Sequence, residues 1–464
     1  METETVFDTA IVNGKIVLEN QVVTGTIAIK DGKIAGVFDE SINVPSRQLL
    51  DATGMTVLPG AIDPHVHLWE PSPQDYREDY NCGSKAAASG GVTTLIEMPL
   101  SVPPVIDKES FDIKKNIADE NSLVDFALWG GLIPKSVDNL PEMHDLGCVG
   151  YKAFISFANP NYPHTPDDIL FKAMKNAAEF NGLVGVHAEN AVIVDTTCRE
   201  MEESGNRDPE SYPDGRPAVA ELEAMQRAIL FAEEAGCRLH IVHMSVAEGG
   251  DMVAKAKDRG VKVSNETCPH YLLFDKSILK EKGPFAKCNP PIRSKENKEA
   301  LWDQIFKGHI DFIGSDHSPY TDEEKLEGKD NIWEALPGFG GIDVLLPAML
   351  SEGVNVRGLG LVEVAKLVST NVAKTFDLYP KKGTISIGSD ADLVLVDLNK
   401  EWTYEGEKTF SKTKSAQGIY EGYQFKGKVM STMVRGTIVY EDGKITADST
   451  YGQYVPIQHQ LTQI

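Results

Sequence analysis

The middle of the chain alternates strand-like and helix-like segments eight times. Short apolar runs, typical of buried strands, recur between longer stretches whose apolar residues repeat every three or four positions, such as Asp167 to Phe180 and Ala218 to Gly236. The eight strand-like runs are AIDPHVH, VTTLIEMP, VDFALWGG, VGYKAFIS, VGVHAE, RLHIVHMS, VKVSNETCPHY and DFIGSDHS. Eight parallel strands with intervening helices predict an α/β fold, a closed (β/α)8 TIM-like barrel.

The two ends of the chain have a different pattern, typical of short antiparallel strands. Residues 6–50 alternate apolar and polar side chains around tight-turn sequences at Asn13 to Lys15 and at Asp31 to Lys33. The same alternation returns in DADLVLVDL, KVMSTMVRG and TIVYEDGKI near the end. We therefore predict a small β-sandwich domain built from both chain termini. The expected boundaries are 1–56 and 387–447 for the sandwich, 57–386 for the barrel and 448–464 for a C-terminal tail.

Composition and charge exclude several classes of protein. The chain has 464 residues, 41% hydrophobic and 25% charged, and a net charge of −24, which argues against nucleic acid or an anionic membrane as a partner. No apolar run approaches the roughly 20 residues of a bilayer span, and the opening METETVFDTA lacks the pattern of a signal peptide. The 6 cysteines form no Cys-x-x-Cys motif and are expected to be reduced. We expect a cytoplasmic protein.

The carboxyl ends of the strand-like runs carry the residues that point to chemistry, because barrel enzymes place their active sites at this face. Alternate residues of a strand face the same way, so His65 and His67 project together. Alone, a strand histidine is more often a satisfied core group, and an aspartate such as Asp316 more often caps a helix. Together, four imidazoles, a lysine and a carboxylate at one face favour a metal site. The full set is His65, His67, Lys152, His187, His243 and Asp316.

These motifs, in this order and spacing, resemble the cyclic amidohydrolase branch of the amidohydrolase superfamily, which includes allantoinases, hydantoinases, dihydropyrimidinases and dihydroorotases. The matching motifs are DPHVH, GYKAF, VHAEN, HIVHMS, ETCPHYLLF, KCNPPIRS, GSDHSPY and KGTISIGSDADLVLVDL. The resemblance implies two divalent metal ions, a homodimer or homotetramer, and a role in purine catabolism. The implied ligands are His65, His67 and Asp316 for one metal, His187 and His243 for the other, and Lys152, carbamylated by carbon dioxide, for both.

The implied chemistry explains these residue types. A lysine ammonium is a poor ligand for a cation, whereas a carbamate offers two anionic oxygens that can bridge metals roughly 3.5–4 Å apart. Two metals lower the pKa of a shared water and polarise an amide carbonyl. Asp316 is then the expected catalytic residue, which takes the proton of the water and delivers it to the departing ring nitrogen. Zinc is the first choice of metal, with manganese, cobalt and iron as alternatives.

The substrate-facing motifs favour hydrolysis of allantoin to allantoate. Dihydroorotases usually carry an arginine and an asparagine for the substrate carboxylate where this chain has Trp69 and Leu100. D-hydantoinases and dihydropyrimidinases place an oxyanion-binding tyrosine where this chain has Phe157. Five motifs instead resemble allantoinases, and partly L-hydantoinases: EMPL, WGGLIP, CPHYLLF, KCNPPIR and SDHSP. Against this assignment, the usual Glu-Pro-Gly-Arg loop of allantoinases reads Glu70-Pro71-Ser72-Pro73 here.

Three other functions remain as alternatives. The first is hydrolysis of 5-substituted hydantoins by a hydantoinase- or dihydropyrimidinase-type enzyme, and the second is a dihydroorotase. The third, a non-catalytic scaffold, is disfavoured because all six ligand positions are retained. Without a tyrosine at position 157, backbone N–H groups near KCNPPIR and PGFGG would help to polarise the carbonyl. The expected substrate contacts are Phe157, His317, Asn289 and Gly338.

Overall fold

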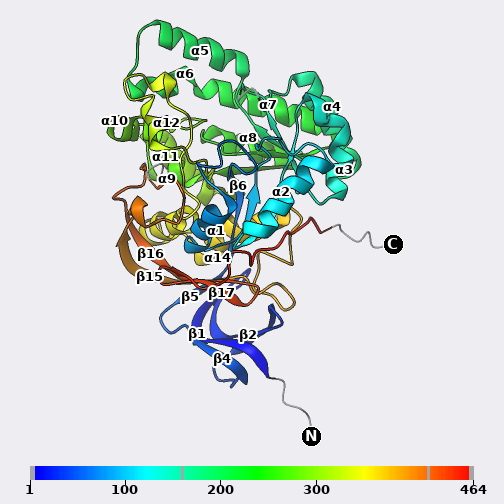
Figure 1. The fold of residues 1–464 in the computed structure, drawn as a ribbon, viewed down its shortest axis with the longest axis vertical. Coiled ribbons are helices and arrows are strands. Elements are labelled where there is room, and N and C mark those ends of the chain that lie inside the picture. The colour runs from blue at the N-terminus through cyan, green and yellow to red at the C-terminus, as the bar shows by residue number, and fades with distance from the viewer. Residues whose placement is uncertain (1–5, 158–160, 415–417, 459–464) are drawn as a thin grey trace.

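The central part of the chain forms the predicted barrel of eight parallel strands. Helices surround these strands (Figure 1). The computed structural model describes residues 6–157, 161–414 and 418–458. Neighbouring strands pair in sequence order, and a parallel bridge between Val66 and His317 closes the barrel. The strands are β6 (Ala61–Val66), β7 (Val92–Glu97), β8 (Asp125–Leu128) continued by β9 (Gly130–Gly131), β10 (Tyr151–Phe154), β11 (Leu183–His187), β12 (Arg238–Ile241), β13 (Val263–Thr267) and β14 (Phe312–Ile313).

Trp129, between β8 and β9, occupies the interior of the barrel. Its indole is fully buried in an apolar cluster that includes Ile62, Ile96 and Phe312. Two glycines make room for this ring: a Cβ atom on Gly150 or Gly185 would lie 2.6 or 2.8 Å from it. The barrel is therefore a packed core and not a channel, and any open space lies at the ends of its strands.

The helices match the amphipathic stretches of the sequence. The stretch from Asp167 to Phe180 contains α4, and the stretch from Ala218 to Gly236 contains α7, whose C-cap is Gly236 with φ 68°. None of the helices in the described part of the chain has the length and hydropathy of a membrane span. The helices are α1 (Tyr80–Ser89), α2 (Lys108–Asn121), α3 (Leu140–Asp145), α4 (Asp167–Glu179), α5 (Ala191–Glu203), α6 (Tyr212–Gly215), α7 (Ala218–Ala235), α8 (Glu248–Asp258), α9 (Pro269–Leu273), α10 (Ile278–Lys282), α11 (Lys295–Phe306), α12 (Asp322–Leu326), α13 (Leu345–Ala348), α14 (Leu361–Ala365) and α15 (Asn371–Thr375).

Both ends of the chain build the second domain, the predicted β-sandwich. Figure 1 shows the blue N-terminal strands beside the orange and red C-terminal ones. β5 joins the two halves, since it pairs in parallel with β1 and antiparallel with β15. Isoleucines from β1, β2 and β3 pack against Leu393 and Met433 in the core. The strands are β1 (Phe7–Val17), β2 (Val22–Lys30), β3 (Lys33–Asp39), β4 (Ser46–Asp51), β5 (Thr56–Pro59), β15 (Leu393–Thr403), β16 (Gln424–Val434), β17 (Thr437–Glu441) and β18 (Lys444–Ile445).

The expected C-terminal tail, as far as residue 458, runs back to the barrel. Tyr454 forms a parallel bridge with Phe126 of β8, and the amide of Val455 donates to the carbonyl of Phe126 at 2.8 Å. Residues 459–464 lie outside the described part of the chain. The tail therefore extends the contact between the end of the chain and the barrel.

A buried ion cluster connects the barrel to the sandwich. The ammonium of Lys382 is fully buried and lies 2.5 Å from Asp125 Oδ2, at the start of β8. It also lies 3.0 Å from Asp390 Oδ2 and 2.7 Å from Asp392 Oδ2, just before β15. Arg435, after β16, forms a further ion pair with Asp125. Buried carboxylates are tolerated only when paired, so the connection between the domains depends on these two cations.

We expect Lys382→Met to lower the free energy of unfolding by about 3–5 kcal/mol, because the substitution leaves buried carboxylates without their cation. The matched control is Lys381→Met. Lys381 pairs with Asp390 at 2.6 Å, but its side chain is 35% exposed. An exposed pair contributes at most about 1 kcal/mol, so the control should change stability little. Urea unfolding followed by circular dichroism measures both, and equal midpoints for the two variants would contradict this account.

Candidate metal centre

The six predicted ligand residues lie at the carboxyl ends of five barrel strands. His65 belongs to the end of β6, and His67 follows that strand directly. Barrel closure brings these ends to one face, where five of the six side chains line a single cavity of about 370 Å³. The sixth, Lys152, is fully buried within β10. The five lining residues are His65, His67, His187, His243 and Asp316.

Three of these residues form one compact group. Asp316 Oδ1 lies 3.2 Å from His65 Nε2 and 3.5 Å from His67 Nε2. One nitrogen or oxygen atom from each residue lies within 4.8 Å of the other two. Burial lowers the pKa of His67 to about 4, so its imidazole is neutral near pH 7 and keeps a lone pair. Two imidazoles and a carboxylate are a suitable donor set for a divalent cation.

His187 and His243 form a second group beside the first. His187 Nδ1 lies 2.9 Å from His243 Nε2, and the ring centroid of His243 is 5.1 Å from that of His65. Burial lowers the pKa of both His187 and His243, so these imidazoles are also neutral. The four rings therefore place their nitrogens at adjacent positions, as a pair of metals would need.

Lys152 adds a buried amine to this arrangement. No residue in the described part of the chain accepts a hydrogen bond from its Nζ, which lies 4.8 Å from the ring centroid of Phe154. Burial lowers the pKa of Lys152 to about 7, so a large fraction of the amine is unprotonated near neutrality. An unpartnered ammonium is costly at such a position. The uncharged amine is also the form that combines with carbon dioxide, so the site fits a modified lysine.

Three residues at this site have a strained backbone conformation. His243 and Asp316 have φ angles of 36° and 50°, and Trp69, two residues after His67, has φ 58°. These values lie in the left-handed region, which residues other than glycine seldom adopt. Strain of this kind persists where the surrounding structure enforces it and commonly marks functional positions.

Glu266 orients His65 from behind. Its Oε1 lies 2.5 Å from His65 Nδ1 and accepts a hydrogen bond from the amide of His243 at 3.2 Å. Its Oε2 lies 3.3 Å from His240 Nε2. Burial alone would raise the pKa of Glu266, but His65 and His240 hold it below its usual range. The carboxylate is thus ionised and turns the other nitrogen of His65 toward Asp316.

Glu189 orients His187 in the same way, and Glu189 is itself paired with Arg216. Glu189 Oε2 lies 2.7 Å from His187 Nε2, and Arg216 Nε donates to Glu189 Oε1 at 3.0 Å. Arg216 Nη2 donates to the other oxygen of the same carboxylate. Sequence reasoning did not identify Glu266, Glu189 or Arg216. The two glutamates carried a usable signal, since each is a charged residue in or directly after a buried strand.

Three of the four predicted substrate contacts lie on the cavity wall. Phe157, Asn289 and Gly338 line the cavity. The amide of Gly338 already donates to the carbonyl of Lys287 at 2.9 Å, so this donor is occupied. Gly338 has φ 142°, and a Cβ atom there would lie 2.7 Å from the carbonyl oxygen of Ser318. The glycine therefore shapes the wall by allowing two loops to approach closely.

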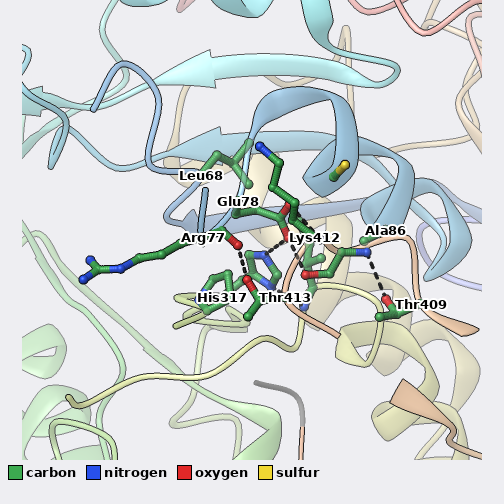
Figure 2. Close-up of polar contacts among 12 residues, drawn as sticks. Leu68, Arg77, Glu78, Ala86, His317, Thr409, Lys412 and Thr413 are labelled. Atoms are coloured by element: carbon green, nitrogen blue, oxygen red, sulfur yellow. Dashed lines mark hydrogen bonds and ion pairs between the residues drawn. The ribbon is translucent and has the colours of Figure 1, made fainter. Parts of the chain in front are cut away.

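His317 is not brought to the cavity wall. Its side chain is fully buried, and its Nδ1 accepts a hydrogen bond from the amide of Gly341 at 3.1 Å. Its Nε2 lies 3.4 Å from Glu78 Oε2, as Figure 2 shows. Glu78 in turn accepts hydrogen bonds from the hydroxyl of Ser411 and the amide of Lys412. His317 thus links the segment of Asp316 to residues 409–413, which extend from the sandwich.

Comparisons with known proteins agree with this geometry. Residues 56–439 match the amidohydrolase family. An allantoinase of Rubrobacter xylanophilus is 41% identical over 452 residues, which cover 97% of this chain and 98% of that protein. An allantoinase of Bacillus licheniformis is 37% identical, with coverages of 97% and 100%. Among solved structures, an L-hydantoinase (dihydropyrimidinase) from Arthrobacter aurescens superimposes with a TM-score of 0.94 at 35% identity, covering 97% of this chain and 100% of that one.

We expect Glu266→Gln to lower metal affinity about 10–100-fold, because an amide orients His65 less firmly and no longer strengthens it as a ligand. Calorimetric titration of the metal-free protein with zinc measures this affinity. The control is His240→Phe, which removes the other partner of Glu266 and leaves its contact with His65, so metal affinity should change much less. Unaltered zinc binding in Glu266→Gln would show that this carboxylate does not support the site.

Proposed function

Because the chain belongs to the amidohydrolase family, we propose that it hydrolyses the ring amide of a small cyclic ureide, with allantoin as substrate and allantoate as product. The observation that carries this proposal is the convergence of four imidazoles, a carboxylate and a buried lysine amine at one cavity. The similarity to two allantoinases over nearly the whole chain supports the choice of ring. The cavity volume of about 370 Å³ suits a small ligand.

We assign two divalent cations to the site, with zinc as the first choice and manganese, cobalt and iron as alternatives. The donor set fits them, since burial lowers the pKa of His67, His187 and His243 and keeps them neutral, and Lys152 Nζ has no partner in the described structure. When bound, the cations supply the positive charge that activates a water molecule and polarises the amide carbonyl. The proposed ligands are His65, His67 and Asp316 for one cation, His187 and His243 for the other, and the carbamate of Lys152 for both.

Asp316 is the residue that we assign to proton transfer. Burial would raise the pKa of this carboxyl, but His65 and His67 hold it below its usual value, so it starts the reaction ionised. It takes a proton from the attacking water and delivers it to the ring nitrogen as the carbon–nitrogen bond breaks. Glu266 and Glu189 keep His65 and His187 in position throughout. The products are a carboxylic acid, which releases its proton to solvent at neutral pH, and an N–H group, with the ring opened.

The alternative substrate is a 5-substituted hydantoin. Trp69, Leu100 and Phe157 all line the cavity, and these apolar side chains would accept an apolar ring substituent. The structural likeness to an L-hydantoinase favours the same alternative. Both substrates use the same ring chemistry, so the choice depends on the cavity wall. We further assign the enzyme to purine catabolism in the cytoplasm as a homodimer or homotetramer, an assembly that light scattering would test.

Allantoin should give the highest kcat/KM in a panel that also contains hydantoin, 5-substituted hydantoins, dihydrouracil and dihydroorotate. The panel is measured with zinc or manganese supplied. If allantoin falls more than about tenfold below a 5-substituted hydantoin, a difference near 1.4 kcal/mol in transition-state stabilisation, the hydantoinase assignment replaces this one. No hydrolysis of any ring by the metal-loaded protein would instead favour a non-catalytic scaffold.

Lys152→Ala should lose most of its bound metal, and kcat should fall by about 100- to 1,000-fold, the scale of losing a principal electrostatic group. A short-chain carboxylic acid or bicarbonate should restore part of the activity by replacing the missing oxygens. Lys114→Ala is the matched control, because Lys114 is equally buried but pairs with Glu97. Elemental analysis measures the metal in both variants. Two metals per chain and full activity in Lys152→Ala would overturn the role of this residue.

A further inference from the structure

Arg77 places a guanidinium on the wall of the cavity that holds the candidate metal centre. Its Cζ lies 4.5 Å from the ring centroid of Trp69 and 4.5 Å from that of Tyr320. The side chain is only 12% exposed. Trp69 follows His67 by two residues and Tyr320 follows Asp316 by four, so both rings extend directly from proposed metal ligands. The guanidinium is therefore fixed on the same wall as the reacting groups.

Glu324 and the backbone fix this side chain further. Arg77 Nε lies 2.9 Å from Glu324 Oε1, and Nη2 lies 2.6 Å from the same oxygen. Tyr76 also donates to Glu324 at 2.7 Å. The backbone carbonyl of Arg77 accepts a hydrogen bond from Thr413. Figure 2 shows the side chain of Arg77 extending away from Glu78 and His317. Such a group loses little further conformational freedom when a ligand binds.

The two terminal nitrogens of this guanidinium differ in their hydrogen bonding. Among the residues that the structure describes, none accepts a hydrogen bond from Arg77 Nη1, whereas Nε and Nη2 are both bound to Glu324. Glu324 also balances the positive charge of the guanidinium. A ligand carboxylate at this place would face the like charge of Glu324, whereas an uncharged carbonyl oxygen would meet a free N–H donor without that repulsion.

We propose that Arg77 is a specificity-determining residue whose free Nη1 donates to the carbonyl oxygen of an uncharged polar substituent on the substrate ring. In allantoin this substituent is the ureido group, so the inference rests on the proposed function. A substrate without such an acceptor leaves the fixed donor unpaired in a partly desolvated site, which disfavours that substrate. Because the substituent does not react, the interaction is made equally before and during the reaction, and its loss should raise KM more than it lowers kcat.

The test compares kcat/KM for allantoin with that for unsubstituted hydantoin in wild type and in Arg77→Met. Methionine can pack between the two aromatic rings but cannot donate. We expect the allantoin-to-hydantoin ratio to fall about 10–100-fold, the usual cost of losing a hydrogen bond to a charged group, mainly through KM for allantoin. Arg77→Lys keeps the charge but not the forked geometry and should give an intermediate ratio. This second variant provides the same readout if Arg77→Met does not fold.

Glu324→Gln tests the choice of an uncharged substituent. The glutamine can still hold Arg77 but no longer repels an anion, so kcat/KM for hydantoin-5-acetic acid should rise relative to that for allantoin. Equal losses for allantoin and hydantoin in Arg77→Met would show that Arg77 only supports the wall, and would overturn this inference while leaving the proposed function intact. A wild-type protein that hydrolyses hydantoin but not allantoin, or no ring at all, would overturn both.

Discussion

Closure of the barrel between its first and last strands brings together side chains that are distant in the sequence. The parallel bridge between Val66 and His317, and the hydrogen bond from the amide of His67 to the carbonyl of His317 at 2.8 Å, fix this junction. Asp316 reaches His65 and His67 only because β14 lies beside β6. The compact interior around Trp129 prevents the strands from shifting, so the cavity stays at the carboxyl ends of the strands.

Charge in the site is arranged in two layers. Burial lowers the pKa of three imidazoles that face the cavity, those of His67, His187 and His243. Glu266 and Glu189 behind the imidazoles are ionised because the histidines and Arg216 stabilise their charge. A cation entering the cavity would therefore meet lone pairs whose orientation is already fixed by negative groups. A carboxylate also fixes the orientation of a cavity-lining side chain farther along the wall, where Glu324 is paired with Arg77.

Much of this arrangement could be predicted from the sequence, because it follows from local periodicity. The apolar runs predicted all eight strands, and the alternation of side chains along β6 predicted that His65 and His67 point the same way. Contacts across the fold could not be predicted in this way. The pairing of Arg77 with Glu324 depends on two loops that meet only in space. His317, whose position beside Asp316 suggested a substrate contact, is buried against Glu78, and no periodic pattern specifies how a loop turns a side chain.

Residues 409–413 are translated late, yet they hold a segment of the cavity wall that is translated early. They belong to the segment that connects β15 to β16, and they hold residues 75–79 through hydrogen bonds to Glu78 and to the carbonyl of Arg77. During synthesis, the segment with His65 and Arg77 therefore leaves the ribosome long before the segment that fixes it. All eight strands of the barrel precede this segment in the sequence, but the contacts that hold residues 75–79 can form only when nearly all of the protein has been translated.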